Sequence, residues 1–200
     1  YMDEITNCFN SDNCIFIITI IFIILIGLYN IYQNYNNHNN NNNYYNNNGN
    51  IYLTMTTIPE RLSHPWFYEN LVHTLNLNGN FKIILNIPYE FKSTGEKYII
   101  PQNILDLQKK NLIINRINED YGPITKLFGA LLNDNISDND ILLVCDDDIH
   151  YKKDFVKLIY NEYIKDDSSI YTYCIPTIEG FKGFMFKKSI MKPILKVIRP

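Results

Sequence analysis

Residues 141–148, ILLVCDDD, decide the fold class of this 200-residue chain. The apolar run Ile141–Cys145 has no polar alternation, which predicts a strand buried on both faces, as in a sheet covered by helices. The carboxylates of Asp146, Asp147 and Asp148 follow directly and repel one another. The simplest way to hold them at the end of a central strand is a bound divalent cation, because hard oxygen ligands suit Mg²⁺, Mn²⁺ or Ca²⁺.

The alternative for this acidic triplet, residues 146–148, is a solvated loop that binds nothing specific. The buried strand in front of the triplet favours a metal site instead. Open α/β sheets bind their ligands at the carboxyl ends of the strands, which is where the triplet lies. The sequence therefore favours a cation site at this end of the strand.

Strand and helix patterns alternate along residues 51–200, which predicts an α/β domain with a mainly parallel sheet flanked by helices. We expect strands at 51–55, 81–87, 112–117, 141–145, 170–175 and 183–186, and helices at 65–75, 123–132, 153–164 and 189–197. Ser63 is the expected cap of the first helix. The helical spacing of residues 153–164 predicts a buried face formed by Phe155, Leu158, Ile159 and Tyr163.

Charge and cysteine content exclude some classes of protein. The formal net charge is -3, and no Lys or Arg precedes Arg61. Without a basic excess we expect no nucleic-acid partner. The cysteines form no C-x-x-C pair and have no metal-ligand spacing, and we expect Cys145 and Cys174 to be buried thiols.

The N-terminal part of the sequence divides into a short tail, 1–13, an apolar run, 14–32, and an Asn-rich segment, 33–50. The apolar run is long enough to cross a bilayer as a single helix. A cleaved signal peptide is the alternative, but the acidic residues before the run and the bulky residues after it favour an uncleaved anchor. The Asn-rich segment cannot build a core, so we expect a disordered linker. We also expect the domain, which starts at residue 51, to continue past Pro200, because the sequence ends within a helical pattern.

Loops 56–61, 119–126 and 146–151 each follow an expected strand, and in a parallel sheet such loops share one edge. The hydroxyls of Thr56 and Thr57 and the guanidinium of Arg61 suit a nucleotide or its phosphates. The structural alternatives are that Thr57 turns the chain and that Arg61 pairs with Glu60.

The second loop contains Asp120-Tyr121-Gly122-Pro123-Ile124-Thr125-Lys126. Gly122 permits a tight turn, and Pro123 opens a helix whose N-terminus favours anions. Lys126 lies one turn further, within reach of a phosphate. The alternative is an ordinary strand-turn-helix connection with a solvated lysine. In the third loop, His150 is expected to be a polar surface residue.

Three motifs together resemble those of GT-A-type glycosyltransferases and glycosyltransferase-like proteins: TTIPERL at 56–62, DYGPITKL at 120–127 and DDDIHY at 146–151. The resemblance covers nearly all of residues 51–200. It implies a GT-A-like fold, a nucleotide-sugar donor, a glycan, protein or lipid acceptor, and Mn²⁺ or Mg²⁺ held through a D-x-D pattern. Here that pattern consists of Asp146 and Asp148.

The resemblance also implies roles for individual residues. It places Thr56, Thr57, Arg61, Asp120, Lys126 and Asp146 around the nucleotide-sugar. Asp147 is a further catalytic candidate. Glu179, ahead of the expected strand 183–186, is our candidate for the base that activates the acceptor.

An anchor followed by a flexible tether is the layout of many glycosyltransferases of secretory membranes, so we expect a single-pass protein of the Golgi or ER with a luminal domain. The sequon Asn135-Ile136-Ser137 agrees with that expectation. The alternative function is a catalytically inactive binding module for nucleotide-sugars or glycans with the same fold. Phosphoryl or nucleotidyl transfer is disfavoured, because the sequence has no G-x-x-x-x-G-K phosphate loop.

Overall fold

The structure is a computed structural model that describes residues 49–172, 183–191 and 193–194. The expected tail, the anchor 14–32 and nearly all of the Asn-rich linker lie outside these residues, as do Cys174 and Glu179. Within the described residues, no helix has the length and apolar character needed to cross a bilayer.

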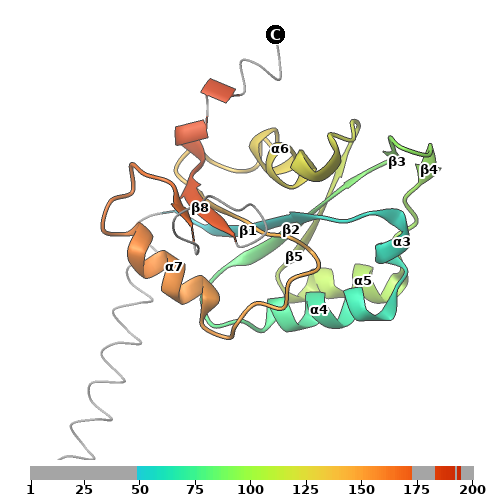
Figure 1. The fold of residues 1–200 in the computed structure, drawn as a ribbon, viewed down its shortest axis with the longest axis horizontal. Coiled ribbons are helices and arrows are strands. Elements are labelled where there is room, and N and C mark those ends of the chain that lie inside the picture. The colour runs from blue at the N-terminus through green and yellow to red at the C-terminus, as the bar shows by residue number, and fades with distance from the viewer. Residues whose placement is uncertain (1–48, 173–182, 192, 195–200) are drawn as a thin grey trace, which may run out of the picture. The chain divides into compact units, whose positions relative to one another are not determined.

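A six-stranded sheet with the strand order β5-β2-β1-β6-β8-β7 forms the centre of the fold (Figure 1). Its strands are β1 (Ile51–Thr56), β2 (Lys82–Pro88), β5 (Leu112–Ile117), β6 (Ile141–Val144), β7 (Tyr171–Thr172) and β8 (Phe184–Lys187). The first four run parallel, whereas β8 pairs antiparallel with β6 and β7 antiparallel with β8. The expected mainly parallel sheet is confirmed, with an antiparallel extension at one edge.

Helices cover both faces of the sheet (Figure 1). One face packs against α4 (Pro65–Leu75), α5 (Gln102–Asp106) and α7 (Phe155–Tyr163), and the other against α6 (Thr125–Leu131). Because side chains alternate along a strand, Leu53 lies in the first core and Tyr52 in the second. The shorter elements are α3 (Pro59–Leu62), β3 (Glu90–Phe91), β4 (Glu96–Lys97), η1 (Leu107–Lys110), η2 (Gly122–Ile124) and η4 (Lys188–Met191).

Strand β6 has the predicted environment. All residues of Ile141–Cys145 are fully buried, and the backbone N–H of Cys145 continues the pairing by donating to the Thr54 carbonyl at 2.9 Å. Helix α4 has the predicted bounds, but His64 is its cap, since the Nδ1 atom of His64 accepts from the Trp66 N–H at 3.4 Å. Ser63 was the wrong choice, because its hydroxyl donates to the Pro59 carbonyl at 3.1 Å.

Helix α7 shows a second difference from the sequence prediction. Leu158, expected on its buried face, is 47% exposed. The buried stripe instead contains Phe155, Val156, Ile159, Tyr160 and Tyr163. Successive residues of a helix are about 100° apart, so this stripe is centred near Phe155 and Val156, and Leu158 lies on the opposite side. The expected helix 189–197 begins as a 3-10 turn, η4, and the described residues 193–194 that follow are helical.

A buried polar network holds α6 close to the sheet. Asn86 donates through Nδ2 to Thr54 Oγ1 at 2.8 Å and accepts through Oδ1 from Asn115 at 2.8 Å. Thr54 in turn donates to the Lys126 carbonyl at 2.5 Å, and Asn115 to the Gly129 carbonyl at 2.9 Å. The approach is so close that a Cβ atom on Gly129 would lie 2.3 Å from Asn86 Oδ1. A larger residue at this position of α6 would have to displace the Asn86 side chain.

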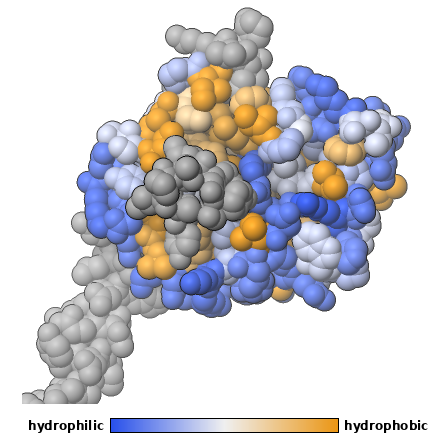
Figure 2. Space-filling model, in the orientation of Figure 1, coloured by the Kyte–Doolittle hydropathy of each residue, from blue (hydrophilic) through white to orange (hydrophobic). Residues whose placement is uncertain are grey.

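Apolar residues gather on the surface around β8 and η4, whereas hydrophilic residues dominate the side that carries the β3–β4 hairpin (Figure 2). Phe184, Ile190 and Met191 in this region are only partly buried.

The Gly129→Ala variant is expected to unfold more easily than the wild type. Overpacking costs about 1–3 kcal/mol, which outweighs the gain of about 1 kcal/mol from removing a glycine in a helix. Urea denaturation of Gly129→Ala, Asn86→Ala and the double variant measures the coupling between the two positions. We expect Gly129→Ala to cost less in the Asn86→Ala background, and an equal cost in both backgrounds would contradict the close approach.

Candidate functional site

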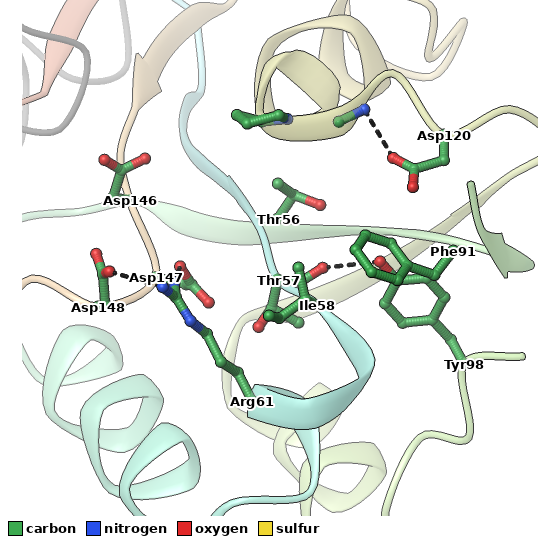
Figure 3. A pocket seen from close by; sticks show the side chains of 12 residues that line it. Thr56, Thr57, Ile58, Arg61, Phe91, Tyr98, Asp120, Asp146, Asp147 and Asp148 are labelled. Atoms are coloured by element: carbon green, nitrogen blue, oxygen red, sulfur yellow. Dashed lines mark hydrogen bonds and ion pairs between the residues drawn. The ribbon is translucent and has the colours of Figure 1, made fainter. Parts of the chain in front are cut away.

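The three loops converge on one pocket at the carboxyl edge of the parallel strands, as the sequence predicted. The pocket has a volume of about 370 Å³. It is lined by residues 56–58 and Arg61 from the first loop, Asp120, Gly122 and Pro123 from the second, residues 146–148 from the third, and Phe91 and Tyr98 from the β3–β4 region. In Figure 3 the acidic triplet and the two aromatic rings lie at opposite ends of the pocket, with Thr56, Thr57 and Ile58 between them.

Arg61 bridges two carboxylates of the triplet (Figure 3). Its Nη1 atom lies 2.8 Å from Oδ1 of Asp147, and its Nη2 atom lies 3.1 Å from Oδ2 of Asp148. The suggested pairing of Arg61 with Glu60 is therefore not what this structure shows. Instead, the guanidinium joins the loop after β1 to the loop after β6.

Lys126 pairs with the remaining carboxylate of the triplet, since its Nζ atom contacts Oδ1 of Asp146. The Lys126 side chain is 14% exposed, so the alternative of a solvated lysine is wrong. The sequence prediction that a bound metal cation is the simplest way to hold the triplet is therefore incomplete, because two protein cations pair with it. Within the described residues, Arg61 and Lys126 already offset part of its charge.

Asp147 is the most buried member of the triplet, with a side chain that is 7% exposed. Burial raises the pKa of its carboxyl above the ordinary 3.8, and the nearby Thr57 hydroxyl and Arg61 guanidinium oppose this rise without cancelling it. Neither Oδ2 of Asp147 nor Oγ1 of Thr57 has a hydrogen-bond partner of good geometry. Buried polar atoms of this kind are rare in native proteins and occur at functional sites.

Helix α4 positions the loop that carries the triplet, which sequence reasoning did not foresee. Asn70 donates through Nδ2 to the carbonyls of Asp147, at 2.9 Å, and Ile149, at 3.2 Å. His73 Nε2 lies 2.8 Å from the Tyr151 carbonyl and its ring stacks on His150, with 3.6 Å between centroids. His150 is exposed, as expected. An amide on a helix has no sequence signal that distinguishes this role from a solvated one.

Asp120 shapes the second loop of the pocket. Its Oδ1 atom accepts from the Gly122 N–H at 2.8 Å and from the Thr125 hydroxyl at 3.2 Å, and its Oδ2 accepts from the Lys92 N–H at 2.9 Å. Gly122 has a φ of 65°, the left-handed conformation that glycine adopts without strain. The Asp-Tyr-Gly-Pro sequence therefore forms a turn that Asp120 ties to the β3–β4 region.

Aromatic side chains form the other end of the pocket, and sequence reasoning missed them. Phe91 and Tyr98 meet edge to face, with 6.3 Å between ring centroids. The Tyr98 hydroxyl donates to the Thr57 carbonyl at 3.1 Å, and burial raises its pKa, which keeps it a donor. The sequence cue that could have found this hairpin is Gly95, which lies between the two aromatic residues. In the structure Gly95 forms the hairpin turn with a φ of 72°.

The donor set fits a divalent cation that arrives with a phosphate ligand. No three Asp, Glu, His or Cys side chains within the described residues converge closely enough to hold a metal by themselves. Mg²⁺ is usually bound through one or two carboxylates together with substrate phosphates, so a preformed cage is not required. Asp146 and Asp148 have side chains that are 25% and 43% exposed, which makes them the accessible ligands.

Comparison with known proteins identifies the fold. No family model and no curated protein matches the sequence. Among solved structures, a mannosyltransferase from Pyrobaculum calidifontis, determined in complex with GDP-Man and Mn²⁺, is similar over 72% of this chain with a TM-score of 0.53 and 11% sequence identity. The described part of the chain has a GT-A-like fold.

Two further structures are similar at lower scores. TarS of S. aureus (residues 1–349) matches over 72% of this chain and 49% of its own, with 11% identity and a TM-score of 0.48. The cytidylyltransferase IspD of Francisella tularensis matches over 76% of this chain and 82% of its own, with 12% identity and a TM-score of 0.44. The chain spans 46% of the length of the mannosyltransferase, less than half.

The burial of Asp147 predicts how stability depends on pH. Because its pKa is higher in the folded than in the unfolded state, the folded carboxyl retains its proton above pH 3.8, where the unfolded one loses it. Wild-type stability should therefore fall relative to Asp147→Asn as the pH rises above 3.8, and then level off. Urea denaturation of both proteins at several pH values in EDTA measures the difference. A difference independent of pH would contradict the raised pKa.

Proposed function

We propose that this chain is a metal-dependent glycosyltransferase that moves a sugar from a nucleotide-sugar donor to a glycan, protein or lipid acceptor. The observation that supports this most strongly is the polarised pocket on a GT-A-like fold. Its acidic and cationic end suits a diphosphate with a divalent cation, and its aromatic end suits a nucleobase.

The first loop and the aromatic end would bind the nucleoside. The base would pack against an apolar wall formed by Ile58, Phe91 and Tyr98. The hydrogen bond from the Tyr98 hydroxyl to the Thr57 carbonyl holds this wall in place. Thr56 lines the same pocket, but its hydroxyl already donates to the Asn86 carbonyl at 2.8 Å. We therefore assign Thr56 a part in the shape of the pocket.

The opposite end would bind the diphosphate and stabilise it as it leaves. Negative charge grows on the diphosphate while the sugar becomes oxocarbenium-like. Arg61 and Lys126 would contact the phosphates, and Asp146 and Asp148 would hold Mn²⁺ or Mg²⁺. When bound, the cation would supply further neutralisation of the leaving group. Asp147 would keep Arg61 in position through their partly buried ion pair.

The residue proposed to activate the acceptor is assigned from the sequence alone. Glu179 remains our candidate for the base that takes the proton from the acceptor hydroxyl, and it lies outside the described residues. The alternative function is a binding module that holds a nucleotide-sugar without turnover.

The Asp148→Ala variant is expected to lose nearly all sugar transfer. The variant lacks one ligand of the cation that would stabilise the developing charge, and loss of one such stabilising interaction costs about 100- to 1000-fold in turnover. The donor is first identified from the rise in melting temperature of the full chain with UDP- and GDP-sugars in Mn²⁺, and release of the nucleoside diphosphate is then measured. Asp134→Ala, which removes an exposed carboxylate that does not line the pocket, is the matched control. Unchanged release in Asp148→Ala would exclude its metal role, and donor binding without release would identify a binding module.

We further propose that residues 14–32 anchor the protein in a secretory membrane with the domain on the luminal side. Asn135, in the sole N-x-S/T triplet of the sequence, is exposed and accessible to a glycan. Expression in a eukaryotic cell should therefore give a chain whose mobility increases on glycosidase treatment. Asn135→Gln should abolish this shift, and Asn139→Gln should retain it. The Asn48→Thr variant adds a second acceptor triplet. If neither the wild type nor this variant is glycosylated, the domain is not luminal.

A further inference from the structure

Arg61 holds two carboxylates whose surroundings differ. Its Nη1 atom contacts Asp147, whose side chain is 7% exposed, and its Nη2 atom contacts Asp148, whose side chain is 43% exposed. The two arms of one guanidinium therefore lie in different environments, one inside the protein and one at the surface of the pocket.

These two ion pairs differ in how readily they exchange partners. Removing the partner of a buried charge is strongly destabilising, whereas an exposed pair contributes little and is easily replaced. The contact with Asp147 is therefore expected to persist, and the contact with Asp148 is the exchangeable one. Asp148 is also one of the carboxylates assigned to the cation.

We propose that Arg61 is the internal counter-ion of Asp148 and competes with a divalent cation for this carboxylate. When the cation and the nucleotide arrive together, Arg61 releases Asp148 and turns its Nη2 atom to the diphosphate. The Nη1 contact with Asp147 acts as the fixed end of this exchange. The inference rests on the proposed nucleotide-sugar site, and it makes Arg61 a positioning residue for the cation as well as a ligand of the phosphates.

The charge of the site supports the exchange. Two cations face three carboxylates, which leaves one formal negative charge. A divalent cation alone would reverse the sign of this charge, and a diphosphate alone would increase it. A cation and a diphosphate together change it little, so each is expected to raise the affinity for the other. Arg61 links cation binding to diphosphate binding, because it releases Asp148 to the cation and then binds the diphosphate.

The test measures Mn²⁺ binding to the full chain by calorimetry, with and without GDP or UDP. The informative variant is Arg61→Ala combined with Asp147→Asn, because it frees Asp148 without a change in net charge and without leaving a buried carboxylate unpaired. Mn²⁺ alone should bind about two- to fivefold more tightly than to the wild type, as expected when a half-exposed ion pair no longer competes. Nucleoside diphosphate in Mn²⁺ should bind more weakly, so the coupling between the two ligands falls.

Control variants separate this role from a structural one. Arg116→Ala removes the other arginine of the described residues, which lies over the Tyr89 ring, and should leave Mn²⁺ binding unchanged. Arg61→Lys keeps the charge but cannot span two carboxylates, so it should resemble the double variant for Mn²⁺ alone. If the double variant binds Mn²⁺ no more tightly than the wild type does, while the wild type still binds nucleotide in Mn²⁺, the exchange is wrong but the proposed function stands. A wild-type chain that binds neither nucleotide in Mn²⁺ overturns the proposed function with it.

Discussion

Repulsion within the acidic triplet is the interaction that constrains the carboxyl edge of the sheet. Three adjacent carboxylates follow β6, and the chain opposes their repulsion with one cation from the loop after β1 and another from α6. An ionised carboxylate as buried as that of Asp147 requires a partner, which Arg61 supplies. The loops after β1 and β6 are thus joined by charge as well as by the parallel pairing of their strands. This is why the two loops face one pocket.

The position of Lys126, the other cation, depends on groups that never reach the pocket. Lys126 lies opposite Asp146 because α6 packs against the sheet over the buried amide of Asn86, with Gly129 leaving room for it. Its own carbonyl accepts from Thr54, which fixes the first turn of the helix. Buried hydrogen bonds have strict geometry, whereas apolar contacts tolerate sliding. The polar network therefore sets the register of α6 relative to the strands, and with it the reach of the lysine.

Sequence reasoning succeeded where local pattern determines the outcome. The unbroken apolar run 141–145 identified the central strand, and the topology of parallel strands then required the three loops to converge. The partners of Arg61 did not follow from sequence, because they are set by side-chain directions across 86 positions. Phe91 and Tyr98 were missed because they lie in or beside two-residue strands, which leave no periodic signal. Leu158 was misplaced because apolar residues lie on both sides of α7, and only packing decides which side is buried.

Unsatisfied polar atoms are concentrated where function is proposed. The buried side-chain oxygens without a hydrogen-bond partner among the described residues are Thr57 Oγ1, Asn70 Oδ1 and Asp147 Oδ2. Thr57 and Asp147 line the pocket, and Asn70 holds the loop that carries the triplet. Such oxygens are uncommon in native proteins, since leaving a buried acceptor or donor unpaired costs about 1–3 kcal/mol. Under the proposed exchange of Arg61 between Asp148 and a diphosphate, some polar atoms of the site would be unpaired in one of the two states. These oxygens of the chain itself therefore support a ligand site at this edge of the sheet.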